Sequence, residues 1–203
     1  MKKILLTSLC SVLVGGLLAQ YPGVHENAPV NHDWQHPLTA KQGKSILDYY
    51  LLLPDYIFEC EIPFEHSEAA RLNAISYKSI KNGYIKAQTN EGEFTVVMFK
   101  DRQKNRDIIA ITKCGAGCQC FVNTYLQFDT MRELWVDASD VMPSDEEFES
   151  VGKKLEEASG QEVWPLFILP EHGTTIMVVD DFSEDRQELY KLVWAGGKFS
   201  IQM

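Results

Sequence analysis

The chain has 203 residues, of which 45% are hydrophobic and 24% are charged, and its formal net charge is −10. This composition is that of a folded globular protein, because disordered chains carry fewer apolar residues. The acidic balance counts against nucleic-acid binding, which depends on clustered Lys and Arg that displace counterions from phosphates. The length fits one compact domain or two small ones.

Residues 1–19 have the pattern of a secretory signal peptide. Lys2 and Lys3 precede an apolar stretch that ends at Ala19. This stretch is too short to favour a membrane-spanning helix, which needs about 20 apolar residues. Cys10 lies in the middle of the stretch rather than at its end, which counts against a lipid anchor. We expect cleavage after Ala19 and release, without membrane insertion, into the periplasm or the extracellular medium.

Cleavage would reduce the five cysteines of the chain to four. An even number of cysteines in a secreted protein favours disulfides. Cys114 and Cys118 are separated by Gly115-Ala116-Gly117, whose two glycines let the loop curl until the Cβ atoms are about 3.8 Å apart. We therefore predict a Cys114–Cys118 disulfide, and a long-range disulfide between Cys60 and Cys120.

A second interpretation of the same residues is a thiol-redox or metal site formed by Cys114, Cys118 and Cys120. Structural zinc sites combine two closely spaced pairs of ligands, whereas the only other cysteine after cleavage is Cys60. Redox catalysis usually needs a Cys-x-x-Cys motif at a helix N-terminus, and here the spacing differs and a strand is predicted to follow. Disulfides are favoured, and both alternatives stay open.

The first elements of the chain are predicted to be a leader and two helices. Residues 20–40 are rich in Pro, Asn and Gln, which is typical of an extended segment. Apolar residues at helical spacing predict a helix over residues 41–53, ended by Pro54. A short helix is expected over residues 68–75, and Asn82-Gly83 is a hairpin-type turn signal.

A meander of strands is predicted next. In one of its strands, Phe94, Val96 and Met98 alternate with Val97 and Phe99, so both faces are apolar. A strand of this kind is expected in the middle of a sheet that is covered on both sides. The strands of this meander are predicted at residues 84–89, 94–100, 107–112, 121–128 and 133–136.

The clearest predicted helix begins after Ser144. Glu147 stands three residues later, so the pair can form a capping box in which each side chain bonds to a free backbone N–H of the other. Gly160 is expected to end this helix. A second meander follows, with strands predicted at residues 164–169, 174–180, 188–194 and 198–202.

The order of these elements predicts the fold class. Helix followed by meander occurs twice, which indicates a single domain over residues 41–203 with possible halves at 41–143 and 144–203. Consecutive hairpins make a sheet antiparallel, because parallel strands need crossover connections. We predict an α+β fold with one antiparallel sheet of about eight or nine strands and helices packed on one face.

Several short motifs together resemble a group of uncharacterised secreted bacterial proteins that contain a domain of unknown function. The resemblance covers roughly residues 45–201 and implies a secreted α+β protein, with no activity to transfer. Cys60 and Cys120 depart from the pattern of this group, which has only the CGxGC pair. The motifs are Asn82-Gly83-Tyr84, Cys114-Gly115-x-Gly117-Cys118, Gly173-Thr174-Thr175-Ile176 and Trp194-x-x-Gly197-Lys198-Phe199.

Aromatic residues on the predicted strands are the best candidates for binding. Rigid aromatic side chains on an exposed sheet face make good anchors for a partner, whereas the same side chains facing inward would be core. The candidates singled out are Tyr84, Tyr125, Trp135 and Trp194.

No sequence motif points to a catalytic residue, a metal ligand or a cofactor. The chain has no Gly-rich phosphate loop, H-E-x-x-H or G-x-S-x-G element. The favoured hypothesis is a secreted, disulfide-stabilised, non-enzymatic module that binds a protein or a small molecule. The alternative is a periplasmic thiol-redox or metal-dependent protein that uses Cys114, Cys118 and Cys120.

Overall fold

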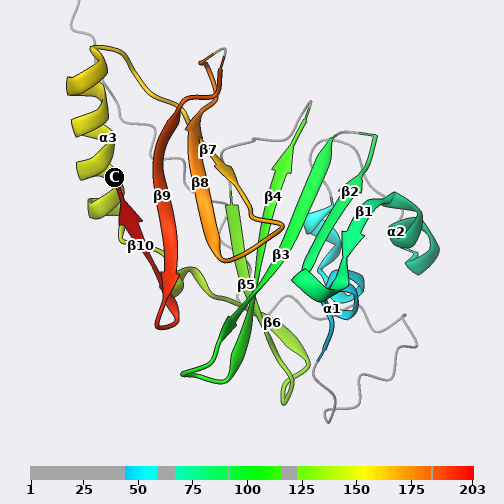
Figure 1. Cartoon of the computed structure of the whole chain (residues 1–203). Helices are drawn as coiled ribbons and strands as arrows, with labels where there is room; N and C mark the ends of the chain where they lie inside the picture. Colours follow the sequence, from blue (N-terminus) through cyan, green and yellow to red (C-terminus); the bar gives the residue numbers. More distant parts are fainter. Residues whose placement is uncertain (1–43, 59–66, 91, 116–122, 184) are drawn as a thin grey trace, which may run out of the picture.

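A computed structural model describes residues 44–58, 67–90, 92–115, 123–183 and 185–203 of the chain. The predicted signal peptide (1–19) and leader (20–40) lie outside these residues. In the described part, ten strands form two antiparallel sheets, and α-helices pack beside them (Figure 1). No helix in this part is long and apolar enough to cross a membrane.

The larger sheet has six strands in chain order, so every neighbouring pair is joined directly along the chain. Its strands are β1 (Ile75–Ser79), β2 (Tyr84–Gln88), β3 (Glu93–Asp101), β4 (Arg106–Cys114), β5 (Asn123–Asp129) and β6 (Leu134–Asp137). The smaller sheet has the order β10-β9-β8-β7. Its strands are β7 (Pro165–Ile168), β8 (Thr175–Asp180), β9 (Glu188–Ala195) and β10 (Lys198–Gln202).

The helices connect and flank the two sheets. The α-helices are α1 (Ile46–Leu52), α2 (Glu68–Ala74) and α3 (Asp145–Ser159), and the 3₁₀ turns are η1 (Asp55–Ile57), η2 (Ile80–Asn82) and η3 (Ser139–Val141). Ser144 and Glu147 form the predicted capping box of α3, and Gly160 ends it at φ 69°. The predicted first helix is shorter than expected, because a second capping box, between Ser45 and Asp48, starts it at Ile46.

The predicted α+β class with antiparallel meanders is confirmed, but the two meanders form separate sheets. Strands β6 and β7 are separated in the chain by η3 and α3, and they belong to different sheets. The strand β1 was not predicted; it lies at the edge of its sheet and its residues are mostly exposed, so it lacks the alternation of a half-buried strand.

One core lies between α1 and the six-stranded sheet. Ile46 and Tyr50 of α1 are fully buried there with Val96, Ile109 and Trp135 of the sheet. Burying side chains of this size contributes about 1.5–3 kcal/mol each. α1 is thereby held against one face of β3 and β4.

A second core lies between the two sheets. Val97 and Phe99 of β3 face Ile176 and Leu192 of the smaller sheet, with Phe199 of β10 beside them. The two apolar faces of β3 are therefore covered by different layers, α1 on one side and the smaller sheet on the other (Figure 1). Helices on one face alone would leave the other face exposed to water.

Candidate functional site

The four aromatic residues predicted to bind a partner do not form an exposed surface. Tyr84, Tyr125 and Trp135 are buried, and Trp194 is partly buried against the ring of Phe199, 4.8 Å away. Trp135 lies beneath α1, and the two tyrosines lie between the sheets. The prediction of an aromatic platform is therefore corrected. Both faces of the six-stranded sheet are covered, so these rings serve as core.

The predicted disulfide residues are described only at Cys114. It ends β4, opposite Glu93, and is disulfide-bonded. The cysteines predicted as partners, Cys60, Cys118 and Cys120, lie outside the described residues, so both pairings stay predictions. Within the described ranges, no group of three or more His, Cys, Asp or Glu side chains could hold a metal ion.

Sequence reasoning missed a polar network at the tip of the β3–β4 hairpin. Its centre is Asp101, which is only 1% exposed at the end of β3. The Asp101 carboxylate accepts hydrogen bonds of 3.1 Å from the backbone N–H groups of Gln103 and Lys104 and from the Nε–H of Arg106. An Asp at the start of a turn can close the turn in this way.

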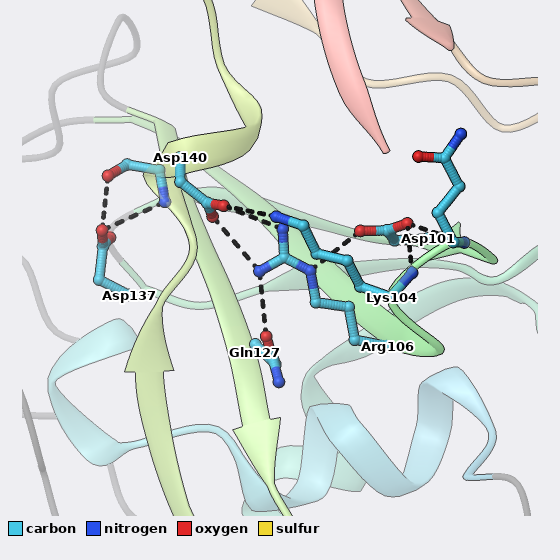
Figure 2. A network of polar contacts seen from close by, with 8 residues as sticks. Asp101, Lys104, Arg106, Gln127, Asp137 and Asp140 are labelled. Atoms are coloured by element: carbon cyan, nitrogen blue, oxygen red, sulfur yellow. Dashed lines mark hydrogen bonds and ion pairs between the residues drawn. The ribbon is translucent and has the colours of Figure 1, made fainter. Parts of the chain in front are cut away.

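Arg106 connects this network to other elements of the fold. Its guanidinium donates to Asp140 of η3, with Nη2–Oδ2 3.0 Å, and to the Oε1 of Gln127 on β5 at 3.2 Å. Lys104 also reaches Asp140, at 3.2 Å (Figure 2). The network thus joins the hairpin tip to the segment that leads from the larger sheet into α3. Asp140 lies 34 positions from Arg106 in the sequence, and no local pattern connects them.

The β9–β10 turn closes over Asp101 from the smaller sheet. A Cβ on Gly197 would lie 2.6 Å from Asp101 Oδ1, a distance shorter than any ordinary contact. Gly197 also has φ +82°, a backbone conformation that side-chain-bearing residues rarely adopt. Position 197 therefore requires glycine for two reasons, the close approach to Asp101 and the positive φ. The buried carboxylate lies between the two sheets.

Electrostatics keep this network charged. Burial opposes ionisation of Asp101, but hydrogen bonds from Lys104, Arg106 and Gln103 outweigh it and lower the pKa of the carboxyl. Burial also opposes the charge of Arg106, but Asp140 and Asp101 outweigh it and raise the pKa of the guanidinium. Both groups therefore carry their full charge at neutral pH.

A cleft of about 520 Å³ lies beside the network. It is enclosed by the end of the β3–β4 hairpin, the β5–β6 turn and one residue of α1. Its lining residues are Tyr49, Lys100, Asp101, Arg102, Asn105, Arg106, Asp107, Gln127, Phe128, Asp129, Thr130 and Met131.

Tyr49 forms the α1 side of the cleft. Its hydroxyl donates to Asp107 Oδ2 at 3.0 Å. Burial, with the negative charge of Asp107 added, raises the pKa of this tyrosine well above its usual value. The hydroxyl therefore stays protonated and keeps its hydrogen bond to the carboxylate at any physiological pH.

The charged side chains of the cleft are unequally paired. Asp101 and Asp107 accept the hydrogen bonds given above, and Asp129 accepts from two backbone N–H groups of its own turn, at 2.9 and 3.1 Å. By contrast, the side chains of Lys100 and Arg102 are exposed and have no ion pair or hydrogen bond within the part of the chain that the structure describes. The carboxylates thus accept hydrogen bonds from internal donors, while two cations face the cleft without an acceptor among the described residues.

Comparisons of the chain with protein-family models, with curated proteins and with solved structures found no match. The resemblance to secreted bacterial proteins therefore stays a prediction. What the protein does has to be inferred from the cleft and from the surface around it.

Proposed function

We propose that the protein is a non-enzymatic binding module, and that its cleft takes a small organic anion. The observation that carries this proposal is the unequal pairing of charges. The carboxylates Asp101, Asp107 and Asp129 already accept internal hydrogen bonds, whereas Lys100 and Arg102 have no acceptor among the described residues. A carboxylate or phosphate group that enters the cleft could accept hydrogen bonds from these two cations.

The apolar part of the lining supports an organic ligand over a bare ion. Tyr49, Phe128 and Met131 line the cleft together with the charged groups. Ligand sites are typically cavities of roughly 300–1,000 Å³ in which apolar walls surround a few polar groups, and this cleft falls within that range. We expect the ligand to place its anionic group toward Lys100 and Arg102, and its carbon skeleton against the aromatic rings.

Fixed charges favour binding over acid–base catalysis. A general acid or base works best when its pKa lies near the working pH. At this cleft the pKa values of Asp101, Arg106 and Tyr49 are all moved away from neutrality, toward permanently charged or permanently protonated forms. Such groups keep the side chains of the cleft in fixed positions and are poorly suited to exchange protons with a substrate.

The site of action that goes with this proposal is the periplasm or the extracellular medium. Support comes from the signal-peptide pattern of residues 1–19 and from the cysteine count after its removal. The bonded state of Cys114 favours a stabilising disulfide over a reactive thiolate. Counting thiols in the native mature protein by mass spectrometry separates the alternatives: four oxidised cysteines support the module, and a reactive thiol or bound zinc supports the redox or metal protein.

Binding is tested by titrating the isotope-labelled protein with acetate, succinate and inorganic phosphate while recording amide NMR spectra. We expect saturable shifts at Arg102 and Asn105. The Lys100→Ala/Arg102→Ala variant should bind the best of these probes about tenfold more weakly or worse. The matched control is Lys153→Ala/Lys154→Ala, which removes the same charge from α3.

Two results would contradict the proposal. One is that none of the three probes shifts the resonances of residues that line the cleft. The other is that the α3 control weakens binding as much as the cleft variant does, because the effect would then come from net charge alone. The residues that are changed are exposed in both variants, so folding is not expected to suffer.

A further inference from the structure

A pair of aromatic residues is exposed away from the cleft. Trp164, just before β7, is 41% exposed, and Phe182, just after β8, is 74% exposed. Their ring centroids lie 5.5 Å apart in an edge-to-face arrangement. In Figure 1 the β8–β9 turn that holds Phe182 lies at the top, whereas the β3–β4 and β5–β6 turns beside the cleft lie at the bottom. This surface is therefore separate from the proposed ligand site.

One carboxylate bonds to the backbones of the two residues that carry the rings. Asp180 Oδ1 accepts the backbone N–H groups of Trp164, at 3.3 Å, and Phe182, at 3.2 Å. The backbone N–H of Asp181 donates to the Trp164 carbonyl at 2.9 Å. The segment before β7 and the turn after β8 are thus tied together at their backbones. A surface ordered in advance loses less conformational entropy when a partner binds.

The charges around the rings are mostly negative. Glu162, Asp181 and Asp185 are exposed, and their carboxylates have no ion pair among the described residues. Arg186 is the cation of this turn that the structure describes. An exposed aromatic pair with carboxylates at its rim is complementary to cationic groups, because the face of a Trp ring attracts a guanidinium or ammonium ion and a carboxylate pairs with it.

We propose that Trp164 and Phe182, with Asp181 and Asp185, form a docking surface for an arginine-rich segment of another protein. Arginine fits better than lysine, because its planar guanidinium both stacks on an aromatic ring and bonds to a carboxylate with two parallel N–H groups. Trp and Arg are also the residues that most often carry binding energy at interfaces. A second copy of this chain fits poorly, since its net charge of −10 would bring like charges together.

The test uses an Arg-Gly-Arg-Gly-Arg-Gly peptide as the probe, with the corresponding Glu-Gly peptide as its counterpart. Binding is followed through the indole N–H resonance of Trp164. We expect saturable shifts with the arginine peptide alone. Two variants should each weaken binding about fivefold to tenfold: Phe182→Ala, which removes a ring, and Asp181→Asn/Asp185→Asn, which removes charge. The second variant changes exposed carboxylates, so it tests the surface without disturbing packing.

The matched controls take equivalent groups from other places. Ile80→Ala removes an exposed apolar side chain from η2, and Glu156→Gln/Glu157→Gln removes two exposed charges from α3. Both controls should bind the peptide like the unchanged protein. The proposal is overturned if the Trp164 resonance does not respond, or if the α3 control loses as much affinity as the Asp181→Asn/Asp185→Asn variant. Self-association that Phe182→Ala abolishes would also overturn it, because the surface would then serve a second copy.

Discussion

Two arginines in this protein are placed alike but have different environments. Arg71 of α2 and Arg106 of β4 are both largely buried, and each bonds to an aspartate. Arg71 donates its other hydrogen bonds to backbone carbonyls, whereas Arg106 donates them to a second carboxylate and to an amide side chain. The acceptors determine the role of each cation. Arg71 stabilises the packing of α2 against the end of α1, and Arg106 holds charged groups in place beside the cleft.

Arg71 acts as a cross-link between α2 and the end of α1. Its guanidinium is 0% exposed, and it donates to the carbonyl of Leu53 at 2.5 Å and to Asp55 at 2.6 Å. It also lies over the ring of Phe58, 4.2 Å from the centroid. Burial lowers the pKa of Arg71 to about 10, although Asp55 partly offsets the effect. The end of α1 and the following turn are thereby held to α2.

Removing Arg71 should have the largest effect on stability. Arg71→Ala removes the hydrogen bonds that Arg71 donates to buried carbonyls and to Asp55, so we expect the free energy of unfolding to fall by about 3 kcal/mol or more. Arg132→Ala, which removes an exposed arginine 3.8 Å from Asp129, should cost less than about 1 kcal/mol. Urea unfolding followed by circular dichroism measures both. Similar losses for the two variants would contradict a structural role for Arg71.

The glycine over the Arg106 network gives a second, smaller test. Gly197→Ala places a methyl group against Asp101, which is held by three hydrogen bonds and cannot move away freely. We expect a loss of about 2–3 kcal/mol, from this collision together with the unfavourable φ. Gly160→Ala is the matched control, because Gly160 also has positive φ, but a new Cβ there would have no atom of the described residues within 4 Å.

The control should cost about 1 kcal/mol, since only the backbone strain is added. Thermal unfolding gives the two losses. The Nε–H resonance of Arg106 should also shift in Gly197→Ala and stay unchanged in Gly160→Ala. Equal losses, or an unmoved resonance, would show that the β9–β10 turn does not hold Asp101.

Acid should affect the Arg106 network in a defined direction. The pKa of Asp101 is lowered in the folded protein, so its contribution to stability is complete above the ordinary carboxyl pKa of 3.8 and is lost as the pH falls through the folded value. Asp101→Asn lacks this contribution. We therefore expect the stability difference between the unchanged protein and this variant to narrow as the pH falls below 3.8.

Urea unfolding at a series of pH values checks this effect, which is the smallest of the three because acid weakens the contribution without removing a side chain. Asp140 titrates in the same direction: burial opposes its ionisation, but Arg106 and Lys104 outweigh burial and lower the pKa of the carboxyl. Asp140→Asn should consequently show the same narrowing to a lesser extent, because Asp140 is half exposed. A stability difference that does not change with pH would contradict this account.

Elements with a local physical signal could be predicted well from the sequence. The Ser144–Glu147 box places the start of α3, because capping depends only on residues three positions apart. The alternation along β3 predicts a strand buried on both faces, and Val96 and Val97 are indeed both buried. The β1 strand carries no such signal, because its residues are mostly exposed.

The candidate site could not be predicted in the same way. Asp101, Arg106 and Asp140 are ordinary charged residues in the sequence, in a chain with 29 acidic residues. The prediction that aromatic residues form a binding surface was wrong for a related reason. The sequence pattern of a strand that is apolar on both faces is the same whether a second layer covers the sheet or not. Tyr84 and Tyr125 are buried by the smaller sheet, which comes from a distant part of the chain.

The α+β class, the meanders and the capped helix follow from sequence patterns alone, since each depends on periodicity or on contacts a few residues apart. The tertiary structure decided that the meanders form two sheets, and that Gly197 of the second closes over Asp101 of the first. Among the residues that the structure describes, it also settled that Lys100 and Arg102 lack an acceptor beside the cleft. Such properties depend on which distant residues share a buried space, because a charge takes its pKa and its partners from that surrounding and not from its neighbours in the chain.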